Sequence, residues 1–589
     1  MERQFKTVLK KTIKIMDQEI IKNAQKWLDG NYDKETKSEV RRLLREKSDE
    51  LVDSFYKDLE FGTGGLRGIM GVGSNRMNKY TVGMATQGLA NYLKNKYAAT
   101  DISVAIAYDC RNNNTFFEGI TANILSANRI SVYKFDALRP TPELSYAVRE
   151  LKCQAGIVIT ASHNPKEYSG YKVYGEDGAQ LISPDDKAVI EEVRKIQSID
   201  DIKFTANREL IHQISNDLDE KYTDEIKKKS LNPNLIKKQK DIKIVYTPIH
   251  GTGVKLVPMA LKKFGFKNII GVDEQNLVDG NFPTVKSPNP EEPEALAMAI
   301  EKAKAENADL VMASDPDADR VGVAVRNSNG DFTLLNGNQT ATLLFNYVLS
   351  QWKNKGKISN KEFIVKTIVT SELLIDIANK YDVDNYDVLT GFKYIAQIIR
   401  EQEGKKQFIL GGEESYGYLI GDFVRDKDAV SSCCFIAETY AWAVDQGKSL
   451  EDLLADIYME HGFYLEELKS VVRTGKAGAD EIQQMMNNYR NNPPKEINGS
   501  PIICIKDYQK QESYNIETGD TEIINLPKSN VIQMFTKDGT KVTMRPSGTE
   551  PKIKFYFSVK GQLDSVNNYE TVKDSLKNKI DSLITELGI

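Results

Sequence analysis

The chain has 589 residues, 40% of them hydrophobic and 28% charged, an ordinary balance for a globular protein with several hydrophobic cores. At roughly 150 residues per domain, this length predicts about four domains. The 79 basic and 84 acidic residues leave a net charge of −5. This balance excludes the strongly basic surface that is typical of nucleic-acid-binding proteins.

The sequence also bears on the cellular compartment. No apolar run approaches the roughly 20 residues that a helix needs to cross a bilayer, so no membrane association is expected. The first residues, "MERQFKTVLKK", lack the apolar core of a signal peptide. Five cysteines without a C-x-x-C pair argue against a disulfide framework or a zinc site and predict a cytoplasmic protein. The sequence does not indicate an oligomeric state.

In chain order, residues 1 to about 50 are expected to form charged amphipathic helices. Short apolar strands then alternate with helices of ten or more residues, a pattern that predicts βα units and largely parallel sheets. The strands are expected at 102–108, 129–135, 155–161, 242–248, 267–272, 308–314 and 320–325. Near the C-terminus, two closely spaced strands ("GTKVTMRPS" and "KIKFYFSV") and a closing helix predict a smaller α+β module.

The apolar run Ile157–Thr160 stops abruptly at "ASHNP", so a strand that looks buried delivers Ser162 and His163 together into a turn closed by proline. Histidine is scarce in this chain, with four in total, which draws attention to the one beside Ser162. The alternative is that His163 is an ordinary polar loop residue.

A second loop follows the predicted strand at 308–314. Asp315, Asp317 and Asp319 alternate along it, which in an extended segment places the three carboxylates on one side. Such like charges are costly unless a cation neutralises them, and hard oxygen ligands suit Mg²⁺. An EF-hand is excluded because Arg320 stands where that loop requires glycine and Arg326 where it requires glutamate. The alternative is a solvated acidic turn.

Three further loops could bind parts of a ligand. The turn around Arg545, in "MRPSGTEPK", offers a guanidinium, hydroxyls and backbone N–H groups suited to a phosphate, although an ordinary hairpin turn fits equally well. "LGGEESYGY" offers Glu413 and Ser415 to sugar hydroxyls, or it is an exposed acidic loop. "FGTGGLRGIMG" is glycine-rich with one cation, Arg67, but no Walker A lysine follows. "HGTGVKL" also lacks the third glycine of a dinucleotide fingerprint.

Taken together and in this order, "TASHNP", "DPDADR", "GEES" and "RPSGTEPK" resemble the phosphoserine, metal, sugar and phosphate loops of the α-D-phosphohexomutase superfamily. "GTGGLRG" and "TGFKYI" also match, and the resemblance covers roughly residues 50 to 589. It implies a four-domain α/β architecture around a central cleft: three related α/β domains with mixed sheets and a smaller α+β C-terminal domain. The expected segments are a helical extension (1–50) and domains at 51–220, 221–330, 331–462 and 463–589.

The resemblance also implies roles for individual residues. Ser162 would carry the phosphate and complete a Mg²⁺ site formed by Asp315, Asp317 and Asp319. Lys172 would be the candidate general acid/base, with His163, Arg67 and Arg320 near the phosphoryl group. The expected sugar and phosphate ligands are Glu413, Ser415, Thr390, Gly391, Lys393 and Lys427, and those of the distal phosphate are Arg545, Ser547, Gly548 and Thr549.

The implied activity is that of a phosphoglucomutase-type phosphosugar mutase, with glucose 1,6-bisphosphate as intermediate and activator. Phosphomannomutase and phosphopentomutase activities are the alternatives, since the N-terminal extension and "TGFKYI" resemble a longer branch that contains both pentose and hexose enzymes. Two rival functions remain at this point: a non-catalytic sugar-phosphate-binding protein and a metal-dependent hydrolase.

Overall fold

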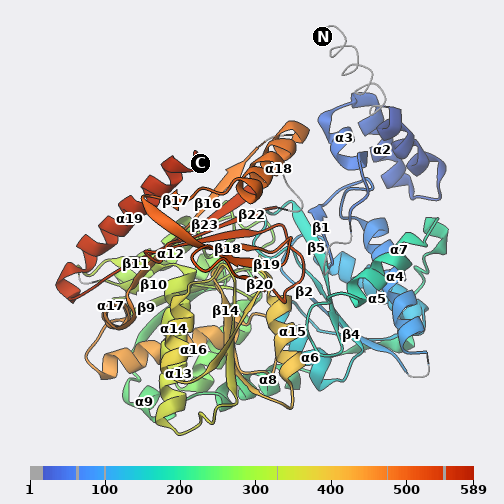
Figure 1. The fold of residues 1–589 in the computed structure, drawn as a ribbon. Coiled ribbons are helices and arrows are strands. Elements are labelled where there is room, and N and C mark those ends of the chain that lie inside the picture. The colour runs from blue at the N-terminus through green and yellow to red at the C-terminus, as the bar shows by residue number, and fades with distance from the viewer. Residues whose placement is uncertain (1–17, 61–64, 99–100, 328, 474, 548–551) are drawn as a thin grey trace, which may run out of the picture. The chain divides into compact units, whose positions relative to one another are not determined.

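The computed structural model describes residues 18–60, 65–98, 101–327, 329–473, 475–547 and 552–589 (Figure 1). The chain divides into two compact units. The first contains Met1–Pro233, Lys240–Gly322 and Leu419–Cys434, and the second contains Asn234–Gln239, Val323–Tyr418 and Phe435–Ile589. Among the described residues, no helix combines the length and the apolar character needed to cross a membrane.

The N-terminal extension is helical wherever it is described, as expected. A helix covers residues 18–29, and α2 (Lys34–Glu46) and α3 (Asp49–Phe55) follow; residues 1–17 lie outside the described part. Asp33 caps α2 by accepting a hydrogen bond from the backbone N–H of Thr36 at 2.8 Å. Trp27 stacks on Tyr32, with ring centroids 4.4 Å apart, inside a small apolar cluster that also contains Tyr80. The extension therefore has its own core, which packs on the first α/β layer.

The first sheet belongs to the first unit and has the strand order β1-β5-β4-β2-β3-β6. β2 runs parallel to β3 and β4, and β6 parallel to β3, whereas β5 is antiparallel to β1 and β4. The strands are β1 (Gly65–Ile69), β2 (Ser103–Tyr108), β3 (Ser131–Lys134), β4 (Ala155–Ile159), β5 (Tyr168–Gly175) and β6 (Ile211–Gln213). The helices are α4 (Lys79–Lys96), α5 (Asn114–Ala127), α6 (Thr141–Glu150) and α7 (Asp185–Arg194), with 3-10 turns at Ile199–Asp201 and Arg208–Leu210.

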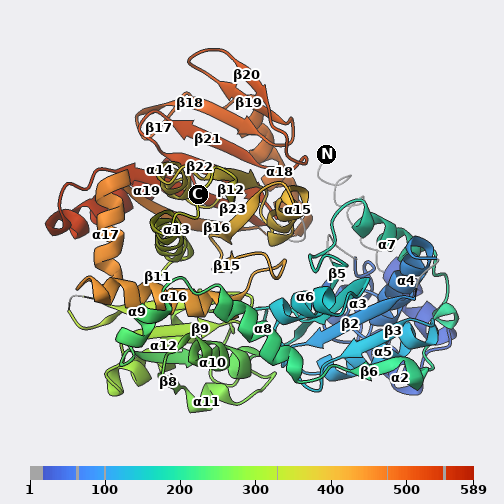
Figure 2. The same ribbon diagram turned by 90° about the horizontal axis from the view of Figure 1, so that it is seen from below.

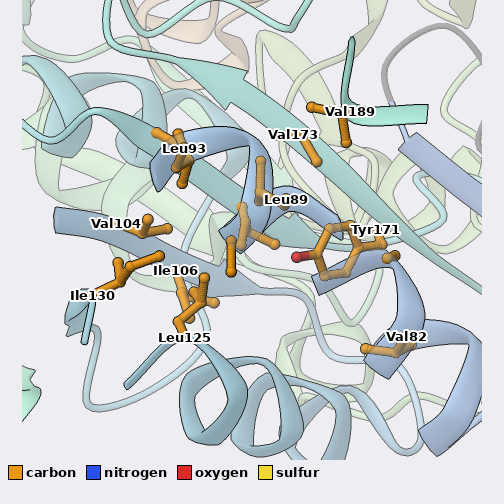
Figure 3. Close-up of a cluster of buried hydrophobic side chains, with 14 of the residues drawn as sticks. Val82, Leu89, Leu93, Val104, Ile106, Leu125, Ile130, Tyr171, Val173 and Val189 are labelled. Atoms are coloured by element: carbon orange, nitrogen blue, oxygen red, sulfur yellow. The ribbon is translucent and has the colours of Figure 1, made fainter. Parts of the chain in front are cut away.

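The core of this layer forms where α4 and α5 cover the sheet (Figure 3). Leu89 and Leu93 of α4 meet Val104 and Ile106 of β2, and all four side chains are fully buried or nearly so. Each such apolar side chain contributes roughly 1.5–3 kcal/mol by leaving water. This packing holds β2 and β4 in place, and the loops that follow these two strands carry the candidate site.

The second sheet has the order β11-β10-β9-β7-β8, with parallel pairs around β7 and an antiparallel β10–β11 hairpin. Its strands are β7 (Lys243–Thr247), β8 (Asn268–Gly271), β9 (Leu310–Ser314), β10 (Val321–Arg326) and β11 (Phe332–Leu335). The helices in this stretch are α8 (Asp217–Lys228), α9 (Pro233–Lys238), α10 (Gly253–Phe264), α11 (Asp273–Asn276) and α12 (Pro293–Ala305). β9 is buried along its whole length and leads directly into the three aspartates.

The third sheet has the order β13-β12-β14-β15, in which β12 lies parallel to both β13 and β14. Its strands are β12 (Glu362–Thr367), β13 (Asp384–Val388), β14 (Gln407–Glu413) and β15 (Gly417–Ile420). The helices are α13 (Gly337–Asn354), α14 (Leu373–Lys380), α15 (Phe392–Gln402), α16 (Ala429–Asp445) and α17 (Leu450–His461).

The fourth sheet has eight strands in the order β16-β23-β22-β21-β18-β19-β20, with β17 paired to β18 (Figure 2). Its strands are β16 (Phe463–Val472), β17 (Glu496–Ile497), β18 (Ser500–Asp507), β19 (Glu512–Asn515), β20 (Thr521–Ile523), β21 (Ile532–Thr536), β22 (Lys541–Pro546) and β23 (Lys552–Gly561). The helices are α18 (Gly475–Asn491) and α19 (Tyr569–Glu586), with a 3-10 turn at Val566–Asn568. The fold class is thus confirmed: three α/β layers precede a C-terminal antiparallel sheet with its own helices.

Candidate active site

Ser162 lies just beyond the carboxyl end of the buried strand β4, in a left-handed backbone conformation with φ of 53°. This conformation costs a non-glycine residue about 1–2 kcal/mol, so the surroundings must enforce it. The backbone N–H of Ser162 donates to the Thr160 hydroxyl at 2.8 Å, and that hydroxyl donates to Asp109 at 2.6 Å. Ser162 itself is 3% exposed. The serine is therefore presented by a fixed loop rather than by an open turn.

Arg111 also holds the Ser162 loop in place. Its guanidinium donates to the carbonyl oxygens of Ser162 at 2.6 Å and Asn164 at 2.5 Å, and also to those of Pro165 and Tyr168. Asp109 balances the buried charge in an ion pair of 3.3 Å. Sequence analysis missed Arg111. The available signal was that it follows the predicted strand at 102–108, and the carboxyl ends of parallel strands share one edge of a sheet.

The three aspartates of the second loop converge, but in a turn and not in the extended segment that was expected: the backbone N–H of Ala318 donates to the Asp315 carbonyl at 2.9 Å, and Ala318 has a φ of 51°. Asp315 and Asp317 are 0% exposed and Asp319 is 2% exposed, and one carboxylate oxygen of each lies within 4.8 Å of the others. The Ser162 hydroxyl donates to Asp315 at 2.8 Å. Burial, followed by the nearby charges of Asp317 and Asp319, raises the pKa of Asp315 well above its ordinary value. The cluster thus contains more negative charge than its surroundings neutralise.

The donor set fits a hard divalent cation. Oδ1 of Asp317 and Oδ1 of Asp319 accept no hydrogen bond from the described residues, although both atoms are buried. Buried carboxylate oxygens are normally hydrogen-bonded, so these two have acceptor capacity for another partner. Carboxylate oxygens are the ligands that Mg²⁺ prefers.

Two lysines flank this cluster. Nζ of Lys172, on β5, lies 2.7 Å from Asp317 and 3.4 Å from Asp319, and Nζ of Lys427 lies 3.0 Å from Asp319. Burial alone would lower the pKa of Lys172, but the two aspartates outweigh burial and raise it above its ordinary value. Lys172 is therefore an ammonium at neutral pH and can donate a proton or a hydrogen bond.

Two positioning contacts in this region were not anticipated from the sequence. The Thr141 hydroxyl, at the first residue of α6, donates to Asp317 at 3.0 Å. Asp426 accepts hydrogen bonds from the Tyr174 hydroxyl at 2.7 Å and from Nζ of Lys427 at 3.0 Å. Thr141 lies outside the recognised motifs, whereas Asp426 directly precedes Lys427 and Tyr174 lies two residues beyond Lys172.

The remaining predicted residues of the first unit also lie close to the serine loop. Arg67, on β1, donates to Asn164 at 3.2 Å, and Nδ1 of His163 lies 3.3 Å from the Ser162 hydroxyl. Burial, followed by the charges of Arg320 and Arg67, lowers the pKa of His163 well below its ordinary value, so the ring is neutral at pH 7. Arg320 pairs with Glu291 at 2.5 Å. The structure thus brings all predicted phosphoryl-group residues of the first unit together.

In the second unit, Glu413 ends β14 and is 6% exposed. It accepts a hydrogen bond from the backbone N–H of Gly391 at 2.9 Å, which joins the "GEES" and "TGFK" segments. Gly391 has a φ of 118°, a conformation that favours glycine. Thr390 precedes it, while Ser415 and Lys393 are partly exposed, with the Lys393 ammonium 5.1 Å from the Tyr394 ring centroid. Glu413 and Gly391 therefore form one local unit.

The predicted phosphate loop lies at the end of β22. Arg545 donates to the Tyr556 hydroxyl at 3.4 Å, and the backbone N–H of Ser547 donates to the Lys552 carbonyl at 2.7 Å. Gly548 and Thr549 lie outside the described residues. Arg545 is partly exposed, as a ligand-binding cation would be.

Comparison with known proteins gives concordant matches along the chain. Residues 58–200, 220–330 and 336–461 match the family models of phosphoglucomutase/phosphomannomutase α/β/α domains I, II and III. A phosphoglucomutase from Staphylococcus haemolyticus is 39% identical over 550 residues, covering 91% of this chain and 98% of that protein. One from Staphylococcus aureus is 39% identical over 558 residues, covering 94% and 97%.

Solved structures share the fold. Paramecium parafusin, a phosphoglucomutase in its open form, has a TM-score of 0.68 at 16% identity and covers 90% of this chain and 96% of its own. A phosphoglucomutase/phosphomannomutase family protein from Burkholderia thailandensis has a TM-score of 0.61 at 18% identity, with 89% and 97% covered. On the family models and the curated relatives together, the chain belongs to the phosphoglucomutase/phosphomannomutase family of the α-D-phosphohexomutase superfamily.

Proposed function

We propose that the protein is a phosphoglucomutase-type phosphosugar mutase, an isomerase that interconverts hexose 1-phosphate and hexose 6-phosphate through a phosphoserine enzyme and a hexose bisphosphate. The single observation that carries the proposal is the 2.8 Å hydrogen bond from the Ser162 hydroxyl to Asp315 within the buried aspartate cluster. A serine phosphate at this position would lie beside a divalent cation. The names of the relatives favour glucose phosphate over mannose or pentose phosphate.

The reaction has two halves that mirror each other. In the first, the P–O bond to Ser162 breaks and a new P–O bond forms to the free hydroxyl of the sugar monophosphate. The sugar hydroxyl loses a proton and the serine oxygen gains one, so protons balance within each half. In the second half, the other phosphate of the bisphosphate returns to Ser162. Positioning and charge stabilisation supply most of the acceleration in such transfers.

The residues of the first unit would have different roles in phosphoryl transfer. Asp315, Asp317 and Asp319 would hold Mg²⁺, which when bound would supply positive charge to the phosphoryl oxygens. We assign Lys172, 2.7 Å from Asp317, as the general acid/base at the sugar oxygen: its ammonium would donate the proton that this oxygen gains when phosphate leaves it, and the resulting amine would accept the proton of the hydroxyl when phosphate is added. Lys427 is the alternative, since it also pairs with Asp319. Arg67, His163 and Arg320 would orient the transferring group.

The loops of the second unit would bind the rest of the sugar phosphate. Glu413 and Ser415, with Thr390, Gly391 and Lys393, would bind hydroxyls. Arg545 and Ser547, with Gly548 and Thr549, would bind the phosphate that is not being transferred. Backbone N–H groups suit this task because they do not demand one orientation of the sugar. We also propose domain boundaries at 51–220, 221–330, 331–462 and 463–589, with each domain contributing one of these loops, and a cytoplasmic location.

The decisive test combines a substrate panel with one variant. Purified protein is assayed with glucose, mannose and ribose 1-phosphates, Mg²⁺ and a trace of glucose 1,6-bisphosphate, while isomer formation and phosphate release are measured separately. We expect isomer formation from glucose 1-phosphate with little phosphate release, and its loss by a factor of ~10⁴ or more in Ser162→Ala. Phosphate release without isomer formation would indicate a hydrolase, and near-normal turnover in Ser162→Ala would reject the assignment of the serine.

A further inference from the structure

A second cluster of buried charges lies in the second unit and contains none of the residues assigned above. Lys366, the fifth residue of β12, is 0% exposed, and Lys541, the first residue of β22, is 3% exposed. Nζ of Lys541 lies 2.6 Å from Glu372, and Nζ of Lys366 lies 3.3 Å from Glu372 and 2.8 Å from Asp387. We refer to Lys366, Lys541, Glu372 and Asp387 as the lysine latch. Lysines are rarely buried to this degree without a specific partner.

The lysine latch binds the backbone of one turn, residues 367–371, which begins at the last residue of β12 and leads to α14. Lys541 donates to the carbonyl oxygens of Ile368 and Thr370, each at 3.2 Å, and Gln533 of β21 donates to that of Ile368 at 2.7 Å. An apolar patch seals the same contact: Ile368, Val369, Leu389, Tyr508, Val531 and Tyr556. Strands of the fourth sheet are thus anchored on a turn of the third sheet.

The same turn also forms hydrogen bonds to the predicted sugar loop. The hydroxyls of Thr367 and Thr370 donate to the Glu414 carboxylate at 3.1 Å and 3.2 Å. Glu414 directly follows Glu413, the residue proposed to bind sugar hydroxyls. The turn is therefore hydrogen-bonded to both Glu414 and Lys541.

The strand that carries Lys541 also carries Arg545. Residues four apart on a strand point to the same face, roughly 13 Å from each other at 3.3 Å per residue. Arg545 donates to Tyr556, whose ring belongs to the apolar patch of the latch. Holding Lys541 on the turn therefore restrains the strand from which Arg545 extends beside Tyr556.

We propose that Lys541 and Glu372 are positioning residues that hold Arg545 and the sugar loop in one geometry, so that the bisphosphate is retained between the two phosphoryl transfers. This inference rests on the proposed function. The retained molecule carries phosphate at both ends, so it can be released after the first half of the cycle unless the phosphate that is not reacting stays bound. Weakening the latch then increases the escape of bisphosphate without altering the groups that transfer phosphate.

The test compares Glu372→Gln, Lys541→Met and Lys541→Arg with Lys537→Met, a matched control at an exposed lysine of the same sheet. Turnover is measured against added glucose 1,6-bisphosphate, and the release of labelled bisphosphate per turnover is counted. For Glu372→Gln and Lys541→Met we expect about a tenfold rise in the bisphosphate concentration required and in its release, equivalent to about 1.4 kcal/mol. Turnover at saturating bisphosphate stays within about threefold of wild type, Lys541→Arg recovers part of the effect, and Lys537→Met shows none.

Wild-type bisphosphate retention in folded Glu372→Gln and Lys541→Met would overturn the proposal. If Lys541→Met does not fold, Glu372→Gln and Lys541→Arg decide the outcome, because each keeps the size or charge of the original side chain. A uniform loss of turnover at every bisphosphate concentration would also overturn it, since that result indicates a purely structural role. Failure of the proposed function is recognised separately, because the wild-type protein would then form no sugar isomer.

Discussion

The aspartate cluster of the first unit and the lysine latch of the second are built from the same parts but differ in how their carboxylates are arranged. In each, two lysines that are buried or only slightly exposed meet buried or half-buried carboxylates. In the latch, backbone carbonyls take up the remaining lysine protons. In the aspartate cluster, Oδ1 of Asp317 and of Asp319 accepts no hydrogen bond from any described residue, and in the latch the same is true of Oδ1 of Asp387, which lies 2.8 Å from Nζ of Lys366. The convergence of three carboxylates, rather than buried charge or an unused acceptor alone, separates a candidate ligand site from an internal support.

The balance of charge points the same way. The latch sets Lys366 and Lys541 against Glu372 and Asp387, so two positive charges face two negative ones. Around the serine, four aspartates (Asp315, Asp317, Asp319 and Asp426) face three cations, Lys172, Lys427 and Arg320, so negative charge exceeds positive charge. Buried like charges are costly without a compensating cation. The comparison therefore predicts that a divalent cation stabilises the first cluster and leaves the second unaffected.

The largest expected effect tests whether the aspartate cluster binds a metal ion that the lysine latch does not. Removing metal with a chelator should abolish mutase turnover, and Mg²⁺ should restore it. In Asp317→Asn, which removes one charge from the cluster, we expect at least about a hundredfold loss of turnover and a much smaller rise in melting temperature on adding Mg²⁺. Glu372→Gln makes the same chemical change in the latch and should keep the wild-type Mg²⁺ shift. Full activity after exhaustive metal removal would contradict the assignment.

The next effect concerns how rigidly the serine loop is held. Arg111→Met removes the guanidinium that binds four carbonyls of this loop but keeps an apolar stem. We expect about a hundredfold fall in turnover, equivalent to about 2.7 kcal/mol of transition-state stabilisation, with labelling of Ser162 by radioactive bisphosphate slowed in parallel. Arg149→Met is the matched control, since Arg149 donates to the carbonyl of Asp177 at 3.0 Å. Unchanged labelling in Arg111→Met would show that the clamp does not position the serine.

The smallest expected effect concerns the stability of the region around the lysine latch, and it is tested at Glu466 of β16. Burial raises the pKa of this carboxyl to about 6, although the Ser371 hydroxyl and Lys541 oppose the shift. A raised carboxyl pKa means that the folded state binds the proton more tightly. The resulting destabilisation therefore appears as pH rises from about 4.5 to about 6, reaches up to about 2 kcal/mol, and stays constant above that range.

Glu466→Gln removes this titration. We expect the variant to melt at a higher temperature than wild type at pH 7.5, and the difference to shrink at pH 5, where wild-type Glu466 is protonated. Glu517→Gln, at an exposed position of the same sheet, should show no such pH-dependent difference. An equal stabilisation by Glu466→Gln at both pH values would show that ionisation of Glu466 is not the cause.

The alternation of strands and helices was readable from the sequence because each element carries its own period. The runs at 155–161, 242–248 and 308–314 contain β4, β7 and β9, and the N-terminal helices appear where amphipathic periodicity placed them. The grouping of the aspartates was equally local, although a turn at Ala318, and not an extended loop, brings the three carboxylates together. Features that depend on neighbours within about ten residues could thus be predicted.

The sequence by itself indicated which residues are candidates to bind phosphate and metal: Ser162, the three aspartates, Lys172 and Arg545 stand in or next to recognisable motifs. Only the tertiary structure decided which groups hold them, because Arg111, Thr141 and Asp426 reach their partners across 51, 176 and 252 residues of chain. The latch shows the same limit, since Lys541 and Glu372 are 169 residues apart. A buried lysine and an exposed one have the same letter in a sequence, and only the folded chain determines whether water or a carboxylate surrounds the charge.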